Sequence, residues 1–304
     1  MSKKSRLTHQ YLQNLQKQTK YNESKHEAKK AEKEASMREN RKYEQVHGIY
    51  STATYKSYSD ACAVFVQYCL DNHKSDIRNF SDCRQYVEEF LQHLEDSKQS
   101  AWTIHHRASA LGAAYGCSKK DFDYKCPERH RADIKRTRGI ASSDYRYPDE
   151  RWDEMKLVIK ATGCRRMELL RLRPEDIRQR EDGNWEVFKR GKNKLERWCM
   201  VTPKYAEQVI DILRSHETYR IAGEDRYFQK SEIPKGAIHD LRADYAKDLY
   251  EYYQSQGIDD GRRYRCRNDM AGKEFSKSVL EKVSHDMLHS RCDVIVNNYM
   301  WKSR

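Results

Sequence analysis

Several side chains in the second half of this sequence could act together on a phosphate ester. Arg165 follows a Thr-Gly turn, and His239 and Arg242 stand three residues apart, which places them on one face of a helix. An arginine binds two phosphate oxygens at once through its planar guanidinium and keeps its proton. Fixed donors of this kind stabilise the negative charge that builds up when a phosphodiester is attacked. The two arginines therefore indicate phosphate transfer that requires no metal ion.

The candidate nucleophile is Tyr299, which stands ten residues after His289. A free tyrosine has a pKa of about 10 and is mostly protonated at neutral pH. It therefore needs nearby cations and a proton acceptor before it can attack. Histidine, with an ordinary pKa of about 6.5, can transfer a proton or donate a hydrogen bond to a phosphate. His285, four residues before His289, is a competing histidine.

A basic turn lies between two runs of strand-forming residues. The runs at 185–188 and 197–201 predict a β-hairpin around it. The turn carries Lys189, Lys192 and Lys194. Taken alone, these lysines also suit a solvated hairpin tip.

In chain order, these segments resemble the catalytic half of the tyrosine recombinases, the phage-integrase family. The resemblance is strong over 150–304 and looser over 50–125. It implies DNA cleavage through a 3′-phosphotyrosine and religation to a partner strand. The catalytic residues that it implies are Arg165, Lys192, His239, Arg242, His289 and Tyr299, with Glu168 as a supporting carboxylate.

The family pattern also selects among neighbouring residues in two of the motifs. An apolar residue and then the arginine follow Thr-Gly in the family, which favours Arg165 over Arg166. The family carries its general acid, a lysine that protonates the departing 5′ oxygen, on a hairpin. Lys192 fits that position best, and Lys194 and Lys189 are the alternatives.

The last motif departs from the family at one position. The run from Val283 to Arg291 matches the family box, but Leu288 stands where the family has a glycine before the histidine. A side chain at that position could tighten the turn or shift the helix that follows. Asn298 stands where many relatives place a histidine before the nucleophile.

The composition indicates a polyanionic partner. The 304 residues carry a formal net charge of +12. Residues 1–42 alone hold twelve Lys/Arg against five Glu, with little apolar periodicity. Lysine and arginine bind nucleic acids by neutralising phosphates and releasing counterions. We interpret 1–42 as a basic arm, helical or disordered, which could lie along DNA or be a solvated tail.

The rest of the chain divides into two predicted domains and a linker. Apolar residues at helical spacing predict a helical core-binding domain over 43–127, and its segment 103–111 resembles a family helix. The basic, turn-rich stretch 128–148 reads as a linker lying against DNA, and 149–304 as the catalytic domain. The predicted fold class is mainly α with a small β-hairpin or sheet, α+β. The candidate DNA-binding residues are Arg107, Lys135, Arg136, Arg138 and Lys194.

Two further features of the sequence limit the possible functions. No C-x-x-C pair occurs among the nine cysteines, which are expected to be free thiols rather than metal ligands. No apolar run is long enough to cross a membrane, and no signal peptide is recognisable. We expect a cytoplasmic protein without cofactor or metal. The arginine-rich insert at 261–267 could contact DNA or another protomer, or form an ordinary surface hairpin.

The function expected from the resemblance is site-specific strand exchange for a phage or integrative mobile element. Its partners would be double-stranded DNA at specific recombination sites, three further copies of the chain on paired sites, and in some systems accessory DNA-bending proteins. The alternatives are a type IB topoisomerase-like enzyme that relaxes DNA, and a non-catalytic DNA-binding protein.

Overall fold

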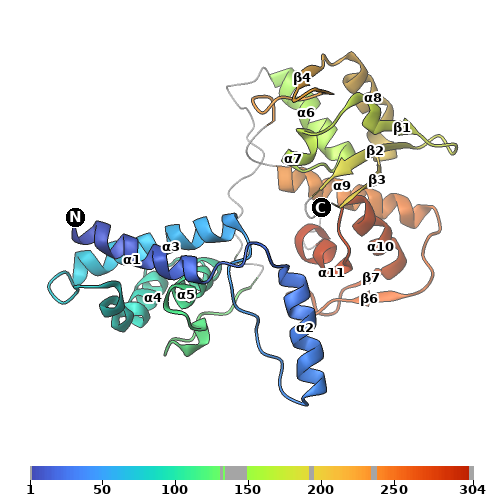
Figure 1. Ribbon diagram of the computed structural model, residues 1–304. Helices are drawn as coiled ribbons and strands as arrows, with labels where there is room; N and C mark the ends of the chain where they lie inside the picture. Colours follow the sequence, from blue (N-terminus) through green and yellow to red (C-terminus); the bar gives the residue numbers. More distant parts are fainter. Residues whose placement is uncertain (1, 131–132, 134–148, 192–194, 234–237, 301–304) are drawn as a thin grey trace. The chain divides into compact units, whose positions relative to one another are not determined.

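The computed structural model describes residues 2–130, 133, 149–191, 195–233 and 238–300. The chain divides into two compact units, Met1–Ile134 and Lys135–Arg304, and each has its own apolar core (Figure 1). The stretch expected to be a linker, 128–148, falls mostly outside the described residues. No described helix is both long and apolar enough to cross a bilayer.

The described part of the first unit is helical. Its α-helices are α1 (Lys3–Lys17), α2 (Lys25–Arg38), α3 (Thr52–Asn72), α4 (Val87–Asp96) and α5 (Ala101–Tyr115). The apolar spacing that predicted the last three is confirmed, because Phe65, Phe90 and Leu111 are buried in one cluster. Ser100 caps α5 by accepting a hydrogen bond from the backbone N–H of Thr103.

The start of the chain differs from the expected basic arm. Helix α1 buries Leu7, Tyr11 and Leu15, which stand four residues apart and therefore share one helix face. This face packs against α3 and α5 and forms part of the first unit's core. The high charge of the segment thus conceals an apolar stripe. Helix α2 matches the expected coreless segment better, since Ser36 is its one buried residue.

The second unit combines helices with small antiparallel sheets, which confirms the α+β fold class (Figure 1). Its helices are α6 (Asp149–Thr162), α7 (Arg166–Leu169), α8 (Ala206–Ser215), α9 (Ile238–Ser255), α10 (Lys277–Asp286) and α11 (Cys292–Ile295), followed by a π-helical turn, Val296–Met300. Strands β1 (Ile177–Gln179), β2 (Trp185–Arg190) and β3 (Glu196–Met200) form one sheet in that order. The predicted hairpin is β2–β3, in which Arg190 pairs with Glu196 next to the turn.

Helix α9 joins two apolar clusters of the second unit. Leu241 lies in the cluster formed with α6 and α8, whereas Tyr245 and Leu249 lie in the cluster formed with α10 and the C-terminal turn. Arg242 stands between them in the sequence and is itself fully buried. The packing of α9 thus fixes a charged side chain inside the unit.

The insert between α9 and α10 forms a small hairpin, β6 (Arg263–Arg265) and β7 (Glu274–Ser276). Three of its arginines have carboxylate partners close by: Arg262 with Asp260 and Glu281, Arg263 with Asp259, and Arg265 with Glu274. The positive charge of this insert is therefore largely compensated within the unit.

Candidate active site

The structure brings five of the six predicted catalytic residues together. Arg165 is the N-cap of the short helix α7, and His239 and Arg242 lie on the first turns of α9. His289 follows α10, and Tyr299 lies in the π-helical turn. The sixth residue, Lys192, lies outside the described residues, as do Lys194, Lys135, Arg136 and Arg138.

A close-packed glycine turn places Arg165. Gly163 has a φ of 60°, a left-handed conformation that glycine adopts without strain. A Cβ at this position would lie 2.2 Å from the ring of Tyr245, so there is no room for a side chain. The Gly163 carbonyl accepts a hydrogen bond from the guanidinium of Arg242. The Gly163 turn therefore positions Arg165, which follows it, and binds Arg242 through its carbonyl.

Glu168 lies between the two arginines. Its carboxylate accepts hydrogen bonds from Arg165 Nη1 at 2.6 Å and from the Arg165 backbone N–H at 2.8 Å, and lies 3.7 Å from Arg242 Nη1. Burial favours the neutral acid, but the charges of Arg242, Arg165 and Lys189 outweigh it and hold the pKa of Glu168 below its usual value. The expected supporting carboxylate is thus ionised and orients both guanidinium groups.

The C-terminal end of α10 binds the cations from the other side. The carbonyl of Met287 accepts from Arg165 Nη2 at 3.4 Å and from Arg242 Nη2 at 3.5 Å. The carbonyl of Asp286 accepts from Lys189 Nζ at 2.7 Å. The last carbonyls of a helix have no partner within it and carry its negative partial charge, so they suit three cations.

His289 faces Arg165 through its ring. Its Nε2 lies 2.9 Å from Arg165 Nη2, and because arginine has no acceptor, Nε2 accepts this hydrogen bond. Burial, together with the charges of Arg165 and Arg242, lowers the pKa of His289 to about 4. The imidazole is therefore neutral at physiological pH.

Tyr299 lies against the same groups and is 3% exposed. Arg242 Nη2 donates to its hydroxyl at 3.4 Å, and Arg242 Cζ lies 5.6 Å from the ring centre. The rings of His239 and His289 lie 6.3 and 6.0 Å from the Tyr299 ring, and that of His239 is stacked on it. The candidate nucleophile thus contacts one arginine and both predicted histidines.

Three neighbouring residues lie apart from the site. Arg166 points to the surface and donates to the Lys230 carbonyl at 3.0 Å. The side chain of His285 is about half exposed and lies beside Asp286. Lys189, an alternative general acid in the sequence, is 1% exposed and bound to the Asp286 carbonyl, so it belongs to the core behind the site. The sequence motifs predicted neither the role of the Met287 carbonyl nor the burial of Lys189.

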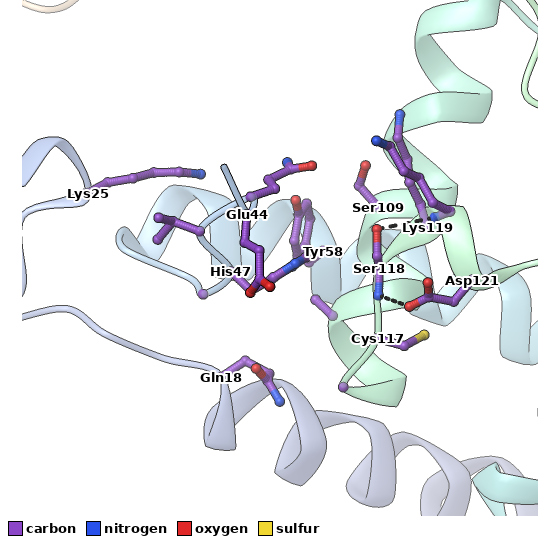
Figure 2. Close-up of a pocket in the computed structure, with 16 residues that line it drawn as sticks. Gln18, Lys25, Glu44, His47, Tyr58, Ser109, Cys117, Ser118, Lys119 and Asp121 are labelled. Atoms are coloured by element: carbon purple, nitrogen blue, oxygen red, sulfur yellow. Dashed lines mark hydrogen bonds between the residues drawn. The ribbon is translucent and has the colours of Figure 1, made fainter. Parts of the chain in front are cut away.

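The first unit holds a different concave site. An open cavity of about 600 Å³ is lined by residues that include Lys25 at the start of α2, Tyr58 on α3, and Lys119 after α5 (Figure 2). Beside it, the backbone N–H of Ser118 donates to the Asp121 carboxylate at 2.7 Å and closes a short turn (Figure 2). Arg107 lies half-buried on α5 and is not among the lining residues. None of the predicted catalytic residues lines this cavity.

Comparison with known proteins gives a likeness in structure. No family model matches this sequence, and no curated protein matches it. The XerH site-specific recombinase bound to palindromic difH substrate in a post-cleavage complex is similar, with a TM-score of 0.50 and 14% identity over 99% of this chain and 94% of that one. The XerH pre-cleavage complex with difH substrate gives a TM-score of 0.51 and 14% identity over 98% and 94% of the two chains. The fold is therefore that of the tyrosine recombinases.

Proposed function

We propose that this protein is a site-specific DNA recombinase that cleaves DNA through Tyr299 and religates the strand to a partner. The observation that carries the proposal is the convergence of Arg165 and Arg242 on the Met287 carbonyl, with Arg242 also donating to the hydroxyl of Tyr299. Two fixed guanidinium groups, one of them bound to a hydroxyl, match the needs of attack on a phosphodiester. The likeness in fold to site-specific recombinases supports it, as does the net charge of +12.

In the proposed first step, the scissile phosphate binds to the guanidinium groups of Arg165 and Arg242. The Tyr299 oxygen attacks phosphorus, the new O–P bond forms, and the bond from phosphorus to the 5′ oxygen breaks. Lys192 on the hairpin turn gives its proton to the leaving 5′ oxygen, with Lys194 as the alternative. The 3′ end is then held as a phosphotyrosine.

The second step reverses the first with another strand. The 5′ hydroxyl of the partner strand attacks the phosphotyrosine and gives its proton to Lys192, the O–P bond to Tyr299 breaks, and the Tyr299 oxygen regains a proton from His239. One phosphodiester replaces another, so the bond energy is conserved and no nucleotide cofactor is required. Four such cleavages exchange two duplexes, which requires four protomers on paired sites.

The two histidines differ in what they can do. His239 is exposed and its ring stacks on the Tyr299 ring, a proximity that supports a role as acceptor of the phenolic proton. His289 is neutral, with a pKa lowered to about 4 by burial and by the charges of Arg165 and Arg242. It therefore serves as a hydrogen-bonding group at the phosphate rather than as a cation.

The proposal is tested by trapping the covalent intermediate. Nicked duplexes with a randomised sequence around the nick lose a short strand after cleavage, so the adduct cannot religate. We expect DNA adducts that resist SDS, are sensitive to protease, and share one sequence when recovered and sequenced. Adducts without any shared sequence, together with relaxation of supercoiled plasmid, would indicate a topoisomerase. Tight DNA binding with no adduct would indicate a non-catalytic binding protein.

The biological setting follows from the recovered sequence. If it lies at the ends of an integrated element, a phage or mobile-element integrase is the fitting role. Accessory DNA-bending proteins would be needed if the purified protein forms adducts yet joins paired sites only with a cell extract.

A further inference from the structure

Leu288 ends α10 in a conformation that usually belongs to glycine. Its φ is 54°, and the chain turns there because the N–H groups of Leu288 and His289 donate to the carbonyls of His285 and Ser284 at 3.0 and 2.8 Å. This is the Schellman pattern of helix ends. A side chain in this left-handed region is strained, so the leucine requires a compensating contact.

The compensating contact is with the hairpin turn. Leu288 is 5% exposed, and a Cβ placed on Gly191 would lie 2.9 Å from Leu288 Cδ1. The leucine side chain therefore occupies the space directly over Gly191. The backbone at Gly191 is not in the left-handed region, so the missing side chain there reflects this close approach rather than a conformational need.

Gly191 begins the turn of the β2–β3 hairpin. Its N–H donates to the Leu195 carbonyl at 2.9 Å and closes the turn. The preceding residue, Arg190, is fixed by its guanidinium to the buried carboxylate of Asp176, with Nη2 to Oδ1 at 2.7 Å. Two contacts therefore hold the start of the turn: the ion pair of Arg190 with Asp176, and the packing of Leu288 against Gly191.

We infer that Leu288 is a positioning residue that fixes the hairpin turn relative to the His289 turn. The inference rests on the proposed function, because the turn carries the lysine that would protonate the leaving oxygen. A glycine at 288 would relieve the backbone strain but would leave Gly191 without its packing partner. Replacing the leucine with glycine should therefore damage catalysis although it suits the local backbone better.

The first experiment compares Leu288→Gly with Leu288→Met, which keeps the apolar volume. On an ordinary suicide duplex we expect Leu288→Gly to slow adduct formation by about tenfold or more, a partial loss of the roughly 10²–10⁴-fold that general acid catalysis contributes. Leu288→Met should stay close to the unmodified protein. On a duplex with a 5′-bridging sulfur, the P–S bond breaks and the thiolate leaves without a proton. The Leu288→Gly defect should then largely disappear.

Two results of this comparison would overturn the inference. One is a Leu288→Gly variant that cleaves the ordinary duplex as fast as the unmodified protein. The other is an equal slowing on the oxygen and sulfur substrates, which would place the effect on the arginines, on His289 or on folding.

The second experiment tests the contact without DNA, through a double-mutant cycle of unfolding free energy. Gly191→Ala should destabilise the unmodified protein but have little effect in the Leu288→Gly background, since the 2.9 Å overlap is then removed and the next neighbours of the added Cβ lie at 3.4 and 3.5 Å. Additive effects would show that the two residues do not touch and would refute the inference. Because this cycle needs no cleavage, it separates a failure of the inference from a failure of the proposed function, which a lack of any adduct would reveal.

Discussion

Arg165 and Arg242, which stand 77 residues apart in the sequence, donate hydrogen bonds to one and the same atom, the carbonyl oxygen of Met287. A backbone atom at the end of α10 therefore sets the distance between the two guanidinium groups. Glu168 binds the same two groups from the opposite side. The arginines are thus oriented before any phosphate arrives, which is the condition for strong electrostatic stabilisation of a transition state.

Replacing Tyr299 with phenylalanine should abolish covalent attachment to DNA. The change removes the hydroxyl but no positive charge, so binding to the recovered site should persist. Adduct formation on the suicide duplex and binding in a gel-shift assay measure the two properties separately. An adduct formed by Tyr299→Phe at the normal level would exclude this tyrosine as the nucleophile.

Arg165→Ala and Arg242→Ala should each slow cleavage by about two orders of magnitude or more, as loss of a transition-state donor does in other enzymes. Arg166→Ala is the matched control, because this neighbouring arginine donates to the Lys230 carbonyl instead. Single-turnover cleavage rates at saturating protein measure the difference. A larger defect for Arg166→Ala than for Arg165→Ala would assign the catalytic role to Arg166 instead of Arg165.

Lys192→Ala should cleave an ordinary duplex slowly and a 5′-bridging phosphorothiolate duplex at nearly the normal rate. Sulfur leaves without a proton, so the general acid is no longer needed. Lys194→Ala is the control, and it should be mild on both substrates. Sulfur rescue of Lys194→Ala but not of Lys192→Ala would move the general acid by two residues.

His289 should make the folded protein less stable as the pH falls. Burial and the charges of Arg165 and Arg242 lower the pKa of His289 to about 4, below the usual value of about 6.5 that it regains on unfolding. Its contribution is therefore complete above pH of about 6.5 and is lost progressively as the pH falls toward 4.

Urea unfolding at a series of pH values tests this prediction. The pH dependence should be shallower in His289→Gln between those limits. An identical pH dependence for the unmodified protein and His289→Gln would contradict the lowered pKa.

Gly163→Ala should destabilise the protein by about 3 kcal/mol or more, because a strained backbone and an overlap add together. The new Cβ would lie 2.2 Å from the Tyr245 ring. Gly183→Ala is the control, since Gly183 also has a positive φ but no atom within 4 Å of the added Cβ. It should cost about 1–2 kcal/mol. Equal unfolding free energies for the two variants would argue against the close packing.

Much of the second unit was predictable from side-chain types and spacing. The motifs selected Arg165, Arg242, His289 and Tyr299, and the structure places them in contact. These residues could be predicted because only a few residue types bind phosphate, and they can be recognised in the sequence. The departure from the family's glycine at Leu288 was visible in the sequence, but the left-handed conformation that the leucine adopts was not predicted.

Other parts could not be predicted because they depend on backbone atoms or on packing. The carbonyl of Met287 serves the site whatever side chain stands there. Lys189 resembles its neighbouring lysines in the sequence, yet strand alternation directs it into the core. In α1, Leu7 and Leu15 stand among many charged residues. The high charge therefore predicted a basic arm, although the two leucines lie on one face of a helix.

The buried stripe of α1 also limits how far this chain can be shortened from its N-terminal side. The next methionine after the first is Met37, and translation from it would omit α1 altogether. The product would also lack nearly all of α2 (Lys25–Arg38); it would keep α3, α4 and α5 but expose the apolar surface that Leu7, Tyr11 and Leu15 cover. We expect a shortened protein of this kind to aggregate, because the uncovered apolar surface has no other partner in the described part of the first unit.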